Sequence, residues 1–315
     1  MKIISQEQIK KLNISPVKCV EWVKESFSLK EFAQLPAKIS LHPQGNDFFN
    51  TMPCLLPSPY NYYGVKVVHR IKGATPALGS DLLLYNSQTG ELLAMLDADW
   101  ITTMRTGAVA TYAIQTFKKS NAQTYGFLGL GNTGRATMLC LLDSEPDIMH
   151  HVILMRYKDQ AESFIERFKE YSNVSFRICD DVQELVSLSD VIVSCITEAQ
   201  GLLCEDNELY REGCLVVPVH TRGFQNCDLF FDKVFADDTA HVCGFKYFNQ
   251  FKQFGEIQDV ISGKIKGRES DKERILSYNI GLGLHDIVYA SKIYEILKDD
   301  SNEIEIVRET EKFWI

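Results

Sequence analysis

A glycine-containing loop at residues 129–134 is the stretch of this sequence whose residue types and spacing most clearly predict chemistry. Gly129, Gly131 and Gly134 form a G-x-G-x-x-G pattern between a short apolar run at 125–128 and an apolar, helix-like segment. In a strand–loop–helix unit this pattern is typical of a dinucleotide site, because the glycines allow a tight turn, backbone approach to a pyrophosphate and close helix packing. The amide groups at the helix N-terminus would then face the phosphates. An ordinary glycine-rich turn is the alternative.

The residues that follow the second predicted strand, 151–155, bear on the choice of dinucleotide. In Rossmann folds a carboxylate at this place binds the ribose. Here the strand is followed by Arg156, Tyr157 and Lys158, and Asp159 comes late. Arg156 and Lys158 suit a 2′-phosphate, so the sequence favours NADP(H) over NAD(H). A solvated basic turn is the alternative.

Four further side chains are candidates for substrate binding or proton transfer. Lys66 lies inside an apolar strand-like run, and Arg105 and Lys38 lie in short motifs elsewhere. His220 ends the apolar run 215–219, at the carboxyl end of a predicted strand, where open parallel sheets bind ligands. A carboxylate substrate needs an arginine fork or lysine charges. Surface charges, and for His220 a hydrogen-bonded loop histidine, are the alternatives; Lys66 alone needs a special explanation.

Composition limits the classes of protein and partner. A chain of 315 residues predicts two domains. The net charge of −9, from 33 basic and 42 acidic residues, argues against a nucleic-acid partner. Nine scattered cysteines without a C-x-x-C motif predict reduced thiols in the cytoplasm and no metal site. No signal peptide and no apolar stretch of about 18 residues is visible, so we expect no membrane span.

The hydrophobic patterns along the chain predict an α/β protein with two kinds of domain. Residues 1–35 have a helical period, and residues 36–118 predict antiparallel strands followed by a helix at 101–117. Strands and helices alternate over 119–260, which is typical of a parallel sheet with crossover helices. Residues 271–297 predict one long amphipathic helix that returns to the first domain. We therefore expect a doubly wound Rossmann domain inserted in an α+β domain.

Several short motifs occur in a fixed order along nearly the whole chain. They are Thr51–Pro53, Gly64–Lys66, Thr89-Gly90, Thr103–Ala108, the glycine loop, Gly267-Arg268 and Arg274–Asp286. This ordered set resembles the ornithine cyclodeaminase/mu-crystallin family. The resemblance implies a homodimer, an NAD(P)-binding Rossmann domain at 119–270, and a substrate-binding and dimerisation domain at 1–118 that is completed by 271–315. It also implies chemistry at the α-carbon of an amino acid or its imine.

The resemblance also implies roles for single residues. Lys66 and Arg105 would bind the substrate, with Arg105 at its carboxylate. The residues implied at the cofactor are Asn132 and Thr133 along the phosphates, Thr197 near the cofactor, and Ile280 and Gly281 near the nicotinamide and the substrate.

Two positions depart from the family pattern. Lys38 stands where the family commonly has an arginine for the substrate carboxylate, and lysine cannot form a bidentate fork. His220 stands where cyclodeaminases carry a catalytic aspartate. A histidine can move a proton, but it provides no permanent negative charge for an ammonium substrate. Ornithine cyclodeaminase activity is therefore disfavoured.

The function that we expect is an NAD(P)-dependent amino-acid dehydrogenase or a reductase of a ketimine or cyclic imine. Arg105 and Lys38 would hold the substrate carboxylate, Lys66 would orient or polarise the imine nitrogen or carbonyl oxygen, and His220 would relay a proton. Two alternatives stay open. One is an ammonia lyase that recycles its NAD internally, and the other is a non-enzymatic NADP(H)-binding protein of the crystallin kind.

Overall fold

The computed structural model describes residues 1–300, 302–307, 309 and 311–312. Its contacts divide the chain differently from the predicted boundaries at residues 118 and 271, because a helix near the N-terminus and residues 271–285 fall in the second unit. Residues 301, 308, 310 and 313–315 of the predicted C-terminal segment lie outside the described residues. The roles expected for the two domains stay predictions. Unit 1 comprises Met1–Asn13, Phe32–Thr102 and Asp286–Ile315, and unit 2 comprises Ile14–Glu31 and Thr103–His285.

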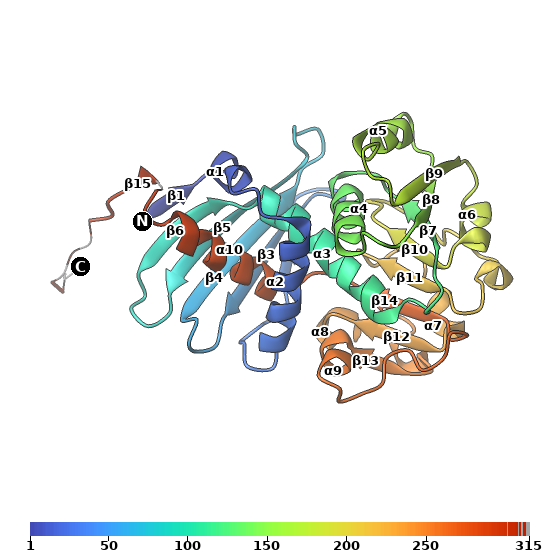
Figure 1. The fold of residues 1–315 in the computed structure, drawn as a ribbon. Coiled ribbons are helices and arrows are strands. Elements are labelled where there is room, and N and C mark those ends of the chain that lie inside the picture. The colour runs from blue at the N-terminus through green and yellow to red at the C-terminus, as the bar shows by residue number, and fades with distance from the viewer. Residues whose placement is uncertain (301, 308, 310, 313–315) are drawn as a thin grey trace. The chain divides into compact units, whose positions relative to one another are not determined.

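Unit 1 is built on a mixed sheet with strand order β15-β1-β6-β5-β4-β3-β2. Helix α10 lies along one face of this sheet (Figure 1), where a side chain at Gly64 would meet Ile287 at 2.5 Å. The elements in chain order are β1 Lys2–Ile4, α1 Gln6–Lys11, β2 Ile39–Leu41, β3 Phe48–Leu55, β4 Tyr62–Arg70, β5 Leu78–Asn86, β6 Leu92–Asp97, the start of α3 Asp99–Phe117, most of α10 Gly283–Leu297, and β15 Asn302–Glu303.

The two faces of the unit 1 sheet differ in burial. Alternation along β3 to β6 places Met52, Lys66 and Leu82 on the covered face, and these residues are buried. The side chains between them point to the other face, where Phe49 and Met95 are 41% and 39% exposed. Among the described residues of unit 1, this second face, the uncovered face, has exposed apolar side chains.

Unit 2 is built on a sheet with strand order β13-β12-β14-β11-β10-β7-β8-β9, and its neighbouring strands pair in parallel. With the mixed sheet of unit 1, this confirms the predicted α/β class. The elements are α2 Pro16–Leu29, the rest of α3, β7 Thr124–Leu128, α4 Asn132–Ser144, β8 His150–Met155, α5 Gln160–Arg167, β9 Val174–Cys179, α6 Val182–Leu188, β10 Val191–Ser194, η1 Asn207–Leu209, β11 Leu215–Pro218, α7 Cys227–Phe230, β12 Lys233–Ala236, α8 Thr239–Val242, η2 Phe248–Gln250, β13 Phe254–Glu256, α9 Ile257–Ile261 and β14 Ile275–Tyr278.

The prediction of one helix over 271–297 is wrong. Ile275–Tyr278 form β14, which lies between β12 and β11 and is buried throughout, and the helix begins only at Gly283. Four apolar residues are enough for a strand that is covered on both faces, but they have no periodicity that separates a strand from a helix. The N-terminal helical prediction likewise missed β1, which pairs in parallel with β6.

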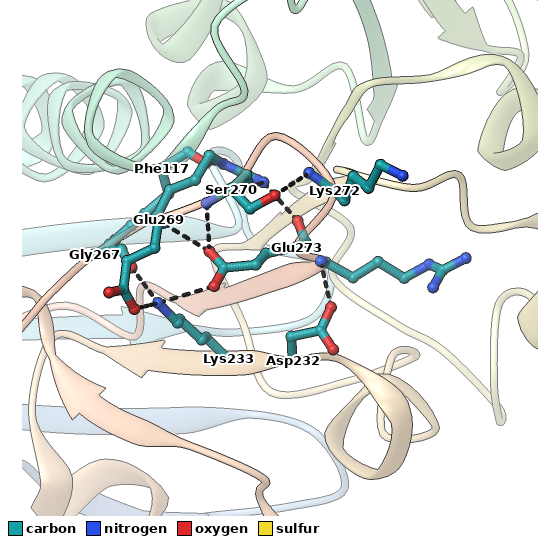
Figure 2. A network of polar contacts seen from close by, with 10 residues as sticks. Phe117, Asp232, Lys233, Gly267, Glu269, Ser270, Lys272 and Glu273 are labelled. Carbon is teal, nitrogen blue, oxygen red and sulfur yellow. Dashed lines mark hydrogen bonds and ion pairs between the residues drawn. The ribbon is translucent and has the colours of Figure 1, made fainter.

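The turn that leads into β14 is held by a polar network (Figure 2). Lys233 Nζ contacts Gly267 O and the carboxylates of Glu269 and Glu273 at 2.7–3.1 Å. Arg268 donates to four carbonyl groups, among them Phe117 O at 2.6 Å. Gly267-Arg268, one of the matching motifs, therefore lies before the amino end of β14 and has structural contacts.

Candidate active site

The carboxyl ends of β7, β10, β11 and β14 lie at one edge of the unit 2 sheet, because these strands are parallel neighbours. The glycine loop follows β7, and Cys195 to Thr197 follow β10. His220 comes two residues after β11, and Ile280 and Gly281 follow β14. Residues predicted for the cofactor, the substrate and proton transfer thus lie, on four segments, at the edge where parallel sheets bind ligands.

The three glycines of the loop differ in the space that a side chain would have at each position. Gly129 has φ +83°, and a side chain there would meet the Cys195 carbonyl carbon at 2.5 Å. A side chain at Gly134 would lie 2.4 Å from Gly129 O. At Gly131 the space is open, with no atom within 4 Å of an added Cβ among the described residues. The fold therefore requires Gly129 and Gly134, whereas the space beside Gly131 stays open.

The N-terminus of α4 fits an anionic group. Its N-cap residue is Gly131, and no side chain among the described residues caps the helix. The first-turn amides of Asn132 and Thr133 thus lie beside the open space at Gly131. A cradle of this kind suits the pyrophosphate of a dinucleotide.

Arg156 lies at the end of β8, as predicted, and its side chain is 42% exposed. Its Nε donates to Asp180 Oδ1 and its Nη1 to Glu162 Oε1, each at 2.6 Å. Lys158 nearby has φ +52°. A phosphate at this turn would meet a guanidinium that two carboxylates already orient.

His220 is a neutral histidine that is hydrogen-bonded to its own loop and to the end of β10. Arg222 N donates to Nδ1 at 3.1 Å, so Nε2 carries the proton and donates to Ser194 Oγ at 2.7 Å. Burial, together with the charge of Arg222, lowers the pKa of His220 to about 4. The contacts are those of the structural alternative, and the proton-relay role stays a prediction.

Arg105 and Gly281 are brought together in unit 2. Arg105 lies on α3 and is 5% exposed. Gly281 has φ +99°, and a side chain there would lie 2.4 Å from Arg105 Nη1. The glycine therefore lets the turn after β14 pack directly against the guanidinium.

Asp237 is a residue of this region that the sequence analysis missed. It follows β12, is fully buried, and accepts a hydrogen bond from Gly281 N at 2.5 Å and one from His241 Nδ1 at 3.2 Å. Burial acts to raise the pKa of Asp237, but the hydrogen bonds from His241 and Gly281 outweigh it and lower the pKa. The signal was an acidic pair, Asp237 and Asp238, directly after an apolar strand.

Lys66 lies in unit 1 and is fully buried in an ion pair. Its Nζ donates to Asp286 Oδ1 at 2.7 Å, and neither side chain is exposed. Asp286 is in the first turn of α10, where the helix dipole favours a carboxylate. The pairing explains a lysine within an apolar strand. Lys38, which comes just before β2, is half-buried.

No group of three or more metal-ligating side chains occurs in the part of the chain that the structure describes. Within that part, no helix is both long and apolar enough to cross a membrane.

Two known proteins and one solved structure are similar to this chain over nearly its whole length. The Δ1-pyrroline-2-carboxylate reductase of Colwellia psychrerythraea is 27% identical over 95% of this chain and 100% of its own length. The alanine dehydrogenase of Archaeoglobus fulgidus is 27% identical over 93% and 94%. The solved structure of Thermococcus litoralis Δ1-pyrroline-2-carboxylate reductase, in complex with NADH and L-proline, superposes with a TM-score of 0.85 at 20% identity, covering 96% of this chain and 100% of that one.

At that identity the solved structure supports the fold alone. The family model of the ornithine cyclodeaminase/mu-crystallin family, however, matches residues 1–301. The chain belongs to the ornithine cyclodeaminase/mu-crystallin family.

Proposed function

We propose that this protein is an NAD(P)-dependent oxidoreductase that acts at the α-carbon of an amino acid or of its ketimine or cyclic imine. The observation that carries the proposal is the uncapped N-terminus of α4 behind the open space at Gly131. Family membership supports it, as do the reductase and dehydrogenase names of the relatives.

The glycine loop, with the amides of Asn132 and Thr133, would hold the pyrophosphate of the cofactor. Thr197 and Ile280, on the same sheet edge, would lie along the rest of it. The nicotinamide supplies or accepts the hydride when it is bound.

Arg105 would bind the substrate carboxylate through its planar fork. Its low exposure and the close approach of the turn at Gly281 support this assignment. In unit 1, Lys66, with Asp286 as its counter-charge, would act as a charged donor to an imine nitrogen or a carbonyl oxygen. Lys38 would add charge for the carboxylate.

His220 favours the oxidoreductase over the ammonia lyase. Its lowered pKa leaves it neutral near pH 7. A neutral imidazole that donates to Ser194 gives no negative charge for a side-chain ammonium. The lyase would need such a charge at this position.

The finer preference for NADP(H) is also part of the proposal. Arg156 and Lys158 close β8, where the ribose of a dinucleotide is bound in Rossmann folds. A 2′-phosphate would compete with Asp180 and Glu162 for Arg156.

We further propose a homodimer formed through the uncovered face of the unit 1 sheet. Exposed apolar side chains gather there, among them Phe49, Met95 and, on β2, Leu41. An apolar sheet face of this kind is stabilised when a second copy covers it. The cytoplasmic location expected from the cysteines stays a prediction.

The substitution Arg105→Ala tests the substrate assignment. We expect kcat/KM to fall about tenfold to a hundredfold, because a charge-assisted hydrogen bond to the carboxylate is lost, while the Kd for the reduced dinucleotide stays unchanged. Steady-state kinetics and nicotinamide fluorescence measure the two quantities. The control is Arg177→Ala, which removes an exposed arginine that pairs with Glu184. A weakened dinucleotide affinity with normal substrate KM would contradict the assignment.

A further inference from the structure

We propose that Asp237 is a positioning residue that, through the turn at Gly281, holds Arg105 in place for the substrate carboxylate. The inference rests on the proposed function for the role of Arg105. The arrangement itself is a feature of unit 2 alone.

The first step is the anchoring of Asp237. Its backbone N donates to Tyr278 O at 3.1 Å, which ties the end of β12 to the end of β14. Its side chain contacts the turn that follows β14, where Oδ2 accepts a hydrogen bond from Gly281 N at 2.5 Å. The carboxylate thus joins two strand ends to the loop that follows them.

The second step is the hydrogen bond to the other carboxylate oxygen of Asp237. Oδ1 lies 3.2 Å from Nδ1 of His241, one turn later on α8. A fully buried carboxylate is costly unless hydrogen bonds satisfy it, and here each oxygen has a partner from a different segment. The side chain is therefore held in one orientation.

The third step is the contact between the turn and Arg105. Gly281 has a positive φ, which a residue with a side chain rarely adopts, and its Cα faces the guanidinium so closely that an added Cβ would lie 2.4 Å from Nη1. If this turn moved, the space available to the Arg105 guanidinium would change as well. Positioning errors far smaller than a side chain reduce catalysis strongly.

The experiment compares Asp237→Ala with Asp237→Asn. The alanine removes the acceptor of the Gly281 amide, whereas asparagine keeps an acceptor oxygen at the same place. The matched control is Asp228→Ala, because Asp228 is also a buried carboxylate of unit 2, but it accepts from Tyr278 OH. If Asp237→Ala does not fold, His241→Ala takes its place, since it removes only the second partner.

Two readouts report on the arrangement without any substrate. Hydrogen exchange of the peptide that contains Gly281 measures the amide bond to Asp237. The rate of modification of Arg105 by phenylglyoxal, followed by peptide mass, measures how firmly the guanidinium is held. A third readout, KM against kcat for the oxo acid or imine, measures the effect on substrate binding.

We expect Asp237→Ala to speed both exchange and Arg105 modification and to raise KM about tenfold, with a smaller change in kcat. Asp237→Asn should recover most of each effect, His241→Ala should give the same changes at smaller size, and Asp228→Ala should give none. Unchanged exchange and modification in the variants would overturn the proposal, as would faster exchange with an unaltered KM. If the wild-type protein turns over no oxo acid or imine, the proposed function fails, while the first two readouts still decide whether Asp237 holds Arg105.

Discussion

His220 is the residue whose expected chemistry differs most from what its surroundings in the structure allow. Its two ring nitrogens are hydrogen-bonded to Arg222 N and Ser194 Oγ, and burial, together with the charge of Arg222, lowers its pKa to about 4. A histidine in this state keeps a fixed tautomer through the pH range in which an ordinary histidine titrates.

We predict that the ring signals of His220 in an NMR titration keep the neutral form down to about pH 5, with His220→Gln to assign them. The folded pKa lies below the unfolded value of 6.5, so His220 contributes stability above about pH 6.5 that is lost as the pH falls towards 4. Urea unfolding of the Gln variant should accordingly show a smaller loss on acidification. A His220 midpoint near pH 6.5 would contradict the burial of its ring.

At the scale of single residues, types were easier to predict from the sequence than partners. Lys66 stood out because a charge in an apolar strand needs a counter-charge, but Asp286 lies 220 residues further along the chain. Asp237 gave only a local acidic signal, because its acceptor role depends on how β12 and β14 pair. Such partners depend on how segments far apart in the sequence pack together, which no local pattern contains.

The strand–loop–helix unit from β7 to α4 gives a matched pair of glycine substitutions. At Gly131 the backbone has φ −74° and open space, so Gly131→Ala should fold normally. Its methyl group would occupy the place of the pyrophosphate, and we expect dinucleotide affinity to fall about tenfold, or about 1.4 kcal/mol. Fluorescence titration with NADH and NADPH measures this affinity.

Gly129→Ala should act differently, because it places a side chain at φ +83° against the Cys195 backbone. We expect a loss of stability of roughly 1–3 kcal/mol in urea unfolding. The control is Gly244→Ala, where an added Cβ has open space.

For the Gly131→Ala variant, a dinucleotide affinity equal to that of the wild type would show that the open space at Gly131 holds no phosphate.

At this scale the sequence predicted the glycine loop and the alternating strands well, because both have local signatures. It failed at β14, whose four buried residues carry no period, and at β1, which is three residues long. Both strands take their structure from their neighbours in the sheet.

For the whole molecule, the uncovered face of the unit 1 sheet predicts the oligomeric state. Phe49→Glu or Met95→Glu would place a charge on this face, and we expect monomers in light scattering after size-exclusion chromatography. Ile148→Glu, at a site of similar exposure in unit 2, is the control and should leave the dimer intact. A wild-type monomer, or dimers in all three variants, would exclude this face as the interface.

The most direct test of the proposed function is the absorbance of reduced nicotinamide in the presence of the purified protein. NADH or NADPH is mixed with a panel of 2-oxo acids with amines and of cyclic imines, and L-ornithine with catalytic NAD is assayed in parallel for proline and ammonia. We predict stoichiometric loss of the reduced cofactor with an imine or oxo acid, faster with NADPH. Proline and ammonia without net cofactor change would instead establish a lyase, and bound cofactor that no substrate oxidises would indicate a binding protein.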